Sequence, residues 1–534
     1  MSVVINKTNT FIFILIFMRL SSGTSQIVFT SQEQVDSYPS ICTNCNLIDQ
    51  DIIINGPISN FDSLSIVEKI EGGISIMQID SFIDWTGFNN VDTITGIING
   101  FGVVTPFIFN GFEQLKSVRS IILTELKGLS GITGFSNLEN IELLLRIQNC
   151  DSLRQAELFP SLKKAEFINV LDNRNLSSLK GFNQLRISNN ISVSFNFNLK
   201  EIDGFHFLDS VYSNLTISVN SNLETINGFD NLRFVGDELT IGANSRLKTI
   251  EGFNSLESCK TFNLVSNIDL INIPKFESLR IVTRNFMFQS SDFLETIDGF
   301  NALETVNGEF RLLRLRSINE ISGFKLYKGG NILFISEISA ENIEGFGSIK
   351  NIDSEIYIAS TSLKNLNFLS SIESVDDSIT LVNNFQLSDI SGPSEIDVFD
   401  LRSLLIEDNS DLSICHEKWV CDYIRSGNGE VRIEDNAPGC LNEDEVLQAC
   451  IVDIEEVNTE NLMVYPNPTS GILNFSSNND QTTAIVYDYL GRELIRSRVV
   501  NNQIDVNKLD NGSYLLHLTK EKGENNQVIK FVKF

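Results

Sequence analysis

Several residue types are scarce in this chain. Its 534 residues include 9 prolines, 5 methionines, 3 histidines and 2 tryptophans, and 40 basic side chains stand against 69 acidic ones. Phosphate binding needs clustered lysine and arginine, so the formal charge of −29 argues against a nucleic-acid partner. The three histidines, His206, His416 and His517, lie far apart without ligand-spaced neighbours, and we therefore expect no metal and no cofactor.

Long hydrophobic runs are also absent beyond Ser25. No later stretch reaches the roughly 20 apolar residues of a membrane-spanning helix, so we expect no integral membrane segment. Near the N-terminus, Lys7 precedes a short apolar run at 11–18, and small residues follow it, which allows cleavage before Gln26. Residues 1–25 are therefore predicted to be a signal peptide, and the mature protein is expected to be exported.

The cysteines are consistent with an oxidising compartment. Four of them lie between 415 and 450, which predicts two disulfides, although the spacing leaves all three pairings open. Cys42 and Cys45 lack a strand–helix redox context, and we interpret them as an end-cap disulfide. Cys150 and Cys259 occur singly and are expected to be buried and free. The disulfide candidates are Cys42, Cys45, Cys415, Cys421, Cys440 and Cys450.

Phenylalanine, by contrast, is abundant, with 38 residues. Many of these recur at intervals of roughly 22–24 residues, usually directly after a glycine, and such a period is typical of stacked structural repeats. The recurring positions are Phe88, Phe112, Phe135, Phe159, Phe182, Phe205, Phe229, Phe253, Phe276, Phe300, Phe324, Phe346 and Phe368.

Each repeat carries the same apolar pattern. In one unit Leu239 and Ile241 stand two apart, the spacing of a short strand with both side chains inward, and Asn244 follows them. A unit this small cannot bury its own apolar face, so successive units must stack around one core. Asn220 and Asn267 occupy the same slot as Asn244, where a stacked asparagine can satisfy backbone groups of the next turn. We predict a mainly β fold, a β-solenoid of about 14 repeats of roughly 22–24 residues, followed by a small β-sandwich.

The repeat region resembles a known family. The opening TSQEQVDSYPSICTNCNLIDQDIIING and units such as LETINGFDNLRFVGDELTIGANS are similar to the cap and repeats of the receptor L domain-like branch of the leucine-rich repeat proteins. Over residues 26–412, this resemblance implies a right-handed leucine-rich-repeat solenoid with a parallel sheet that recognises ligands. Residues 413–450 resemble the cysteine-rich cap that shields the last turn, with Trp419 in the core of the cap.

The last part of the chain follows another pattern. Residues 451–461 are acidic and aperiodic, which predicts a linker, and residues 462–534 contain short alternating apolar runs separated by turn residues. The pieces YPNPTSG, IVYDYLGREL, LDNGSYLLHL and IKFVKF resemble the type A sorting domain of the type IX secretion system. The resemblance implies delivery by that machinery, removal of the domain, and a secreted or outer-membrane cell-surface protein. The sorting motif comprises Tyr465, Pro466, Asn467, Pro468 and Gly471.

No catalytic motif is present, and we expect that the protein is not an enzyme. The enzyme alternative is a surface polysaccharide-degrading enzyme on a β-helix, whose coils are of similar length. Repeats of such even length leave almost no room for the catalytic insertions that this kind of enzyme needs. A purely structural surface coat is the other alternative, and it predicts uniformly polar exposed strand positions.

The exposed strand position between the two inward residues distinguishes these alternatives. It is small and polar in the middle of the stack, but four consecutive units carry larger side chains of types enriched at binding interfaces. We therefore predict a recognition or adhesion protein that binds an unidentified extracellular protein or glycan through its sheet. The candidate ligand-binding residues are Met287, Arg311, Phe334 and Tyr357.

Overall fold

The computed structural model describes residues 25–77, 84–452, 463–475, 483–488, 492–519 and 527–534. These residues form two compact units, one ending at Ala449 and one beginning at Cys450. The predicted signal peptide, apart from its last residue, and all but the first two residues of the predicted linker lie outside the described residues.

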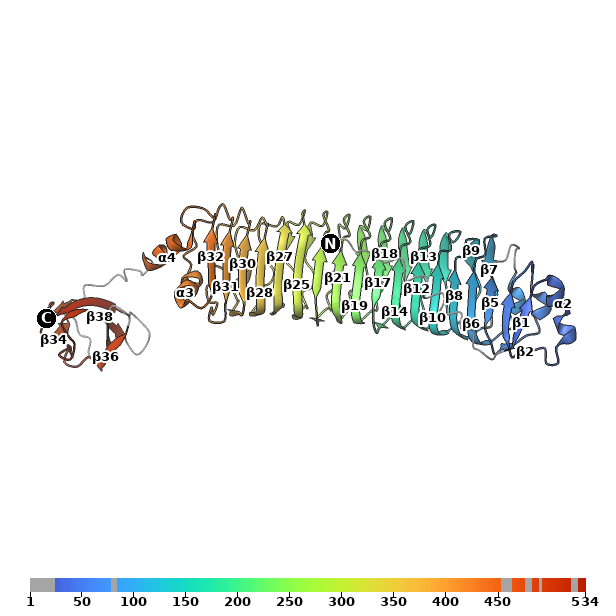
Figure 1. Cartoon of the computed structure of the whole chain (residues 1–534), viewed down its shortest axis with the longest axis horizontal. Helices are drawn as coiled ribbons and strands as arrows, with labels where there is room; N and C mark the ends of the chain where they lie inside the picture. Colours follow the sequence, from blue (N-terminus) through green and yellow to red (C-terminus); the bar gives the residue numbers. More distant parts are fainter. Residues whose placement is uncertain (1–24, 78–83, 453–462, 476–482, 489–491, 520–526) are drawn as a thin grey trace. The chain divides into compact units, whose positions relative to one another are not determined.

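The first unit is a parallel β-solenoid, so the predicted fold class is confirmed (Figure 1). It has about 17 turns, more than the 14 predicted, because the irregular coils at both ends lack the regular phenylalanine spacing yet join the same sheet. The principal strands of that sheet, one from each coil, are β1 (Gln26–Phe29), β3 (Asp51–Ile54), β5 (Ile74–Met77), β6 (Thr93–Phe101), β8 (Ser117–Thr124), β10 (Asn140–Gln148), β12 (Lys164–Leu171), β14 (Ile187–Ser194), β17 (Leu215–Ser218), β19 (Phe234–Gly242), β21 (Ser258–Val265), β23 (Phe286–Gln289), β25 (Thr305–Leu315), β27 (Gly329–Ile338), β28 (Asn351–Ala359), β30 (Ser378–Val382), β31 (Ser403–Glu407) and β32 (Glu430–Glu434).

Shorter elements complete each coil. Additional short strands of the large sheet are β2 (Leu47–Ile48), β4 (Lys69–Ile70), β16 (Ser210–Val211), β22 (Ile281–Val282) and β29 (Ser374–Val375). Further parallel sheets comprise β7 (Phe107–Phe109) with β9 (Leu129–Ile132), β24 (Thr296–Ile297) with β26 (Glu320–Ile321), and the set β11 (Gln155–Leu158), β13 (Ser178–Gly181), β15 (Glu201–Gly204), β18 (Thr225–Gly228) and β20 (Thr249–Glu251). Single 3-10 turns occur at η1 (Asp62–Leu64), η2 (Thr86–Phe88) and η3 (Asn367–Leu369).

A row of stacked phenylalanines runs through the core of the solenoid. The rings of Phe229 and Phe253 are fully buried, and their centroids are 4.9 Å apart with an interplanar angle of 15°. Equivalent ring pairs continue on both sides, including Phe205 on Phe229 and Phe300 on Phe324. This burial explains the fixed spacing of phenylalanine in the sequence, because each coil contributes one ring to a continuous stack.

The glycine that precedes most of these phenylalanines is required by close packing of the coils. Gly228 has φ of +137°, and a Cβ atom at this position would collide with the carbonyl oxygen of Gly204 in the preceding coil. A larger residue would therefore both strain the backbone and separate the coils.

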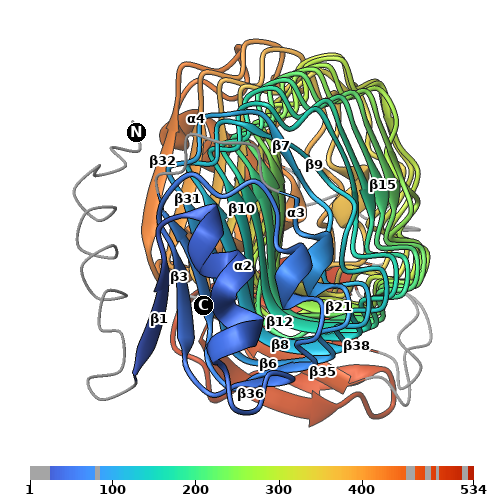
Figure 2. The ribbon, with the colours of Figure 1, turned by 90° about the vertical axis from the view of Figure 1, so that its right-hand side faces the viewer.

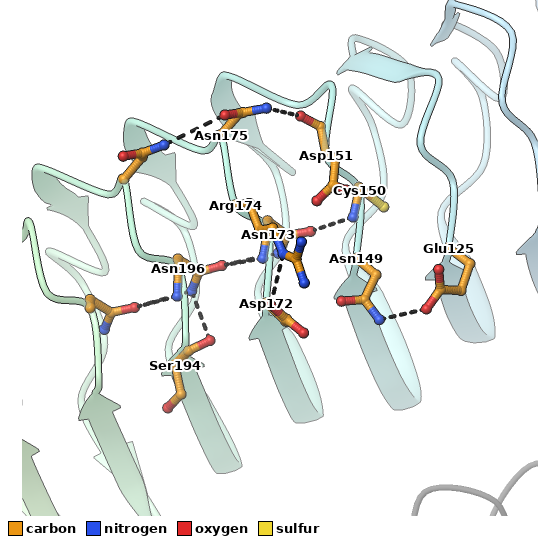
Figure 3. Close-up of polar contacts among 12 residues, drawn as sticks. Glu125, Asn149, Cys150, Asp151, Asp172, Asn173, Arg174, Asn175, Ser194 and Asn196 are labelled. Carbon is orange, nitrogen blue, oxygen red and sulfur yellow. Dashed lines mark hydrogen bonds and ion pairs between the residues drawn. The ribbon is translucent and has the colours of Figure 1, made fainter.

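A second row, of buried asparagines, joins the coils through hydrogen bonds (Figure 3). Asn173 donates its backbone N–H to the Oδ1 of Asn196 at 3.0 Å, and the backbone N–H of Cys150 donates to the Oδ1 of Asn173 at the same distance. Asn244 and Asn267 continue the row in later coils. The predicted role of the asparagine slot is thus confirmed, since each side chain satisfies a backbone group of the neighbouring turn.

Helices lie near the two ends of the solenoid. Helix α2 (Gln32–Ile41) crosses the first coil, as the view along the stack shows (Figure 2), and the disulfide Cys42–Cys45 follows it. At the other end are α3 (Lys418–Ser426), the disulfide Cys415–Cys440 and α4 (Glu443–Val452). Trp419 on α3 is buried, and its Nε1 donates to the carbonyl of Ile390 at 2.9 Å. Cys150 and Cys259 are buried free thiols.

The second unit contains two antiparallel sheets. One comprises β33 (Val464–Tyr465), β34 (Ile472–Phe475) and β37 (Gln503–Asp505), and the other β36 (Glu493–Arg498), β35 (Thr483–Tyr487), β38 (Gly512–Thr519) and β39 (Gln527–Lys533). Leu473, Phe475, Val486, Leu516 and Phe531 pack together in its core. Both sheets contribute to one apolar core, as expected for a small β-sandwich.

Candidate functional site

One outward-facing position recurs in every coil and forms a row along the large sheet. Arg311, for example, stands between the fully buried Phe310 and Leu312. Because the strands are parallel and in register, successive residues of the row are direct partners about 4.8 Å apart. From β10 to β32 the row is Arg146, Asn169, Ser192, Thr216, Thr240, Asn263, Met287, Arg311, Phe334, Tyr357, Thr380, Leu405 and Arg432.

The structure brings the four candidate ligand-binding residues together on this row. Met287 is the strand partner of Arg311, which is the partner of Phe334, which in turn pairs with Tyr357. The rings of Phe334 and Tyr357 are stacked, with centroids 4.7 Å apart and an interplanar angle of 8°. The guanidinium carbon of Arg311 lies 4.2 Å from the centroid of the Phe334 ring. Stacking of this kind fixes the position of all three side chains before any ligand arrives.

Two carboxylates flank this cluster on the same face of the sheet. Glu309 accepts a hydrogen bond from the Nε of Arg311 at 2.5 Å and forms an ion pair with it. Glu355 stands two strands away from Glu309, with Ile332 between them in the register. Burial raises the pKa of Glu355, and the negative charges of Asp377 and Glu309 raise it further.

Glu309 and Glu355 were not among the residues predicted from the sequence. The prediction rested on the middle outward position of each strand, whereas these glutamates occupy the outward position two residues earlier. The signal was nevertheless available, because side chains two apart in a strand point to the same face.

The row changes character on either side of the cluster. Toward the N-terminus it becomes small and polar, and Asn263 donates from Nδ2 to Glu238 at 2.6 Å and to Thr240 at 3.2 Å. Toward the C-terminus, Thr380 is buried and Leu405 half-buried, and Arg432 forms ion pairs with Glu407 and Glu434. The aromatic cluster is therefore local and is not a feature of the whole row.

The residues of the sorting motif lie in the second unit, where the chain packs against its last strand. Asn467 donates from Nδ2 to the carbonyl of Lys530 at 3.0 Å, and its Oδ1 accepts from the backbone N–H of Val532 at 2.9 Å. The bonds from Tyr465 to Pro466 and from Asn467 to Pro468 are cis. Gly471 donates its backbone N–H to the Oγ1 of Thr469 at 3.1 Å.

Within the described ranges, no group of three His, Cys, Asp or Glu side chains is arranged to hold a metal ion. In the same part of the chain, no helix combines the length and apolar character needed to cross a membrane.

Comparison with known proteins identifies the class of the C-terminal unit. Residues 463–533 match the family described as the secretion system C-terminal sorting domain, so the chain carries a type IX sorting domain and is secreted or attached to the cell surface. Among curated proteins, a stretch of 66 residues is 42% identical to Beta-agarase D of Zobellia galactanivorans. The stretch covers 12% of this chain and 14% of that protein.

These findings correct one prediction. The sequence analysis classed the protein as not an enzyme, and this is wrong, because the chain shares a segment with an agarase and its β-solenoid is an architecture that polysaccharide-degrading enzymes also use. The prediction relied on missing sequence motifs and on even coil lengths. Neither excludes carboxylates that only the stacking of coils brings to one face, as it does Glu309 and Glu355.

Proposed function

We propose that the outward face of the large sheet binds a polysaccharide, and that the sorting domain delivers this binding surface out of the cell. The observation that supports the proposal is the stacked pair Phe334 and Tyr357, held by Arg311 and flanked by Glu309 and Glu355. Aromatic rings accept the apolar C–H faces of sugars, and carboxylates accept hydrogen bonds from sugar hydroxyls.

Two other interpretations of the same face are less well supported. A purely structural coat requires uniformly polar exposed positions, and the row from Met287 to Tyr357 is not uniform. A protein ligand of ordinary affinity needs a broad interface of about 800 Å² on each partner with an apolar centre. The rings of Phe334 and Tyr357 are half-buried and bordered by carboxylates. They form a narrow strip, whose shape favours an extended sugar chain over a protein as the ligand.

We also infer that the solenoid belongs to the receptor L domain-like branch of the leucine-rich repeat proteins, within residues 26–412, closed by a cap at 413–450. The repeat sequences quoted above support this inference, as do the asparagine row and the parallel sheets. We infer that residues 462–534 are a sorting domain of type A. This inference rests on the YPNPTSG motif and on the segments IVYDYLGREL, LDNGSYLLHL and IKFVKF.

The binding proposal is tested by substitutions along the row. Arg311→Ala and Tyr357→Ala should each weaken polysaccharide binding by about 1–3 kcal/mol, because large side chains concentrate binding energy. Thr216→Ala and Thr240→Ala, in the small polar part of the row, should change it little. Calorimetry with galactan oligosaccharides measures the four values. Equal effects from both pairs, or none from the first pair, would remove this face as the binding surface.

Cleavage of the bound polysaccharide is a second candidate function, supported by the segment shared with Beta-agarase D and by the environment of Glu355. Burial and neighbouring negative charges raise the pKa of Glu355, which suits this residue to give a proton to the leaving glycosidic oxygen. Glu309, which forms an ion pair with Arg311, can take a proton from the attacking water. Two strand spacings put the backbones of these residues about 9.6 Å apart, close to the upper limit of about 9.5 Å between the carboxyl groups of inverting glycosidases.

Reducing-end assays on agarose and related galactans test cleavage. Glu355→Gln should abolish the release of reducing ends and retain binding, because glutamine keeps an acceptor oxygen for a sugar hydroxyl but has no acid proton to donate. If the unsubstituted protein binds a galactan and releases no reducing ends from it, binding alone is its function.

A further inference from the structure

A single arginine stands on an otherwise uncharged part of the same sheet face. The segments 97–101, 120–124, 144–148, 167–171, 190–194 and 215–218 belong to six neighbouring strands in continuous register. Arg146 is the one charged residue in these six segments. It occupies the same outward row as Arg311, seven strands away, at a distance of about 34 Å.

Arg146 is half-buried, and in the described part of the chain its buried Nε has no partner. Its strand partners are Ile122 and Asn169, and Leu144 lies two residues earlier on the same face. The Nε of Arg146 is buried, and within the described ranges it has no hydrogen-bond acceptor. Burial lowers the pKa of the guanidinium, with no contribution from a charged neighbour in the described part of the chain.

Arg311, in the aromatic cluster, differs from Arg146 because it has an ionic partner. Arg311 is paired with Glu309, so its charge is already compensated within the protein. Removing a guanidinium from water is unfavourable unless hydrogen bonds and an opposite charge replace the lost hydration. Among the described residues the buried Nε of Arg146 lacks this compensation, and an anion from outside the protein would provide it.

We infer that the polysaccharide bound by this face carries anionic groups, carboxylate or sulfate, and that Arg146 binds one of them. This inference rests on the proposed function and adds the chemical class of the ligand. A guanidinium presents its N–H donors as a planar fork that matches the oxygens of carboxylate and sulfate, which is why arginine is suited to such groups.

The acidic character of the whole chain does not oppose this contact. Arg146 gives the six segments a charge of +1, so all of the chain's negative charge lies outside them, and charges more than about 8 Å away are largely screened at physiological ionic strength. The overall charge instead disfavours nonspecific binding of polyanions, so recognition depends on the local site at Arg146.

The test compares three polymers and a charge-matched pair of variants. Agarose is a neutral galactan, κ-carrageenan a sulfated galactan, and polygalacturonate a carboxylated polymer. Arg146→Gln removes the proposed contact, whereas Arg119→Gln removes the same charge from an exposed arginine on the neighbouring strand β8. Arg146→Met retains the apolar stem and serves as a second variant if Arg146→Gln lowers the melting temperature.

We expect the unsubstituted protein to bind one or both anionic polymers more tightly than agarose. Arg146→Gln and Arg146→Met should weaken that binding by about tenfold or more and leave agarose binding unchanged, since a hydrogen-bonded charge contact contributes roughly 1.5–3 kcal/mol. Arg119→Gln should change neither. The polymer that responds to Arg146 identifies the anion as sulfate or carboxylate.

Other results would overturn the inference. If agarose binds as tightly as the anionic polymers, or if Arg119→Gln and Arg146→Gln act equally, Arg146 is not an anion site, although the binding face stands. If none of the polymers binds, the proposed function itself fails.

Discussion

The phenylalanine at the corner of each coil from Phe112 to Phe346 adopts an unusual backbone conformation. Phe229 and Phe253 have φ of +62° and +58°, in the left-handed region, which costs a non-glycine residue roughly 1–2 kcal/mol. Stacking and full burial of the rings offset this cost. The burial of these residues could be predicted from their spacing, whereas their conformation could not, because glycine is the residue normally expected there.

Truncation of one ring of the stack should be strongly destabilising. Phe229→Ala and Phe253→Ala should each lower the free energy of unfolding by roughly 3–5 kcal/mol, because a cavity remains between two neighbouring rings. Chemical denaturation measures the loss. Phe207→Ala, at a side chain that is 42% exposed, is the matched control, and an equally small effect at Phe229 would contradict the stack.

A histidine links neighbouring coils at the surface. The Nδ1 of His206 lies 2.7 Å from the Oδ2 of Asp230, and its Nε2 lies 3.3 Å from the Oδ1 of Asp203. The hydrogen bond with Asp230 is the largest cause that raises the pKa of His206 above its ordinary value of 6.5, and Asp203 adds to it against the opposing effect of burial.

This arrangement predicts a stability that depends on pH. Because the folded state has the higher pKa, the stabilisation by His206 is fully present below pH 6.5 and is lost as the pH rises through the folded-state pKa. Unfolding measured on both sides of that value should show a decline that His206→Gln lacks. Asp230→Asn should lower the pKa of His206 in an NMR titration, and an unchanged titration would refute the role of Asp230.

The strands themselves could be predicted from two inward residues per repeat, but the corner that follows each strand could not. The residue at this second corner also has positive φ, as at Asn149, Asp172, Val219 and Ala243. These positions share no side-chain type, so the sequence contains no signal for the turn. The carboxylates of the candidate site were missed at the same scale, since only one outward position per strand was followed.

Relief of backbone strain at this second corner should stabilise the solenoid. Val219 has φ of +58°, which a β-branched residue adopts only with strain, whereas asparagine tolerates this region. Val219→Asn should therefore raise the free energy of unfolding by about 1 kcal/mol. Asn383→Val, at an equivalent corner with φ of +57°, is the reciprocal substitution and should lower it. Shifts of the same sign in both variants would show that backbone conformation does not control stability here.

For the whole molecule, the sequence was informative about architecture and less so about chemistry. The solenoid and the sorting domain were predicted because each repeats or matches a long pattern. The number of turns was underestimated at the irregular ends, and the enzyme class was judged wrongly. Glu309 and Glu355, which are 46 residues apart in the sequence, come onto one face only when successive coils stack, which no local motif records.

Export of the protein and folding of its solenoid should depend on different parts of the chain. Deletion of residues 463–534 should leave the solenoid folded, because the two units have separate cores, and should leave the protein in the periplasm. Circular dichroism and cell fractionation measure the two outcomes. Fusion of residues 463–534 to an unrelated exported protein should confer release or surface attachment. Normal levels of the truncated protein outside the cell would assign the domain another role.

The shared register of the coils has a consequence for how such a protein can evolve. Duplication or loss of a gene segment that encodes one whole coil, between Arg146 and Arg311, would move these residues apart or together by one strand spacing, about 4.8 Å. Each local environment would be preserved, because a coil contacts only its immediate neighbours. The length of the intervening stack could thus be adjusted in steps to the repeat distance of a polymeric ligand, without any change in the residues that touch it.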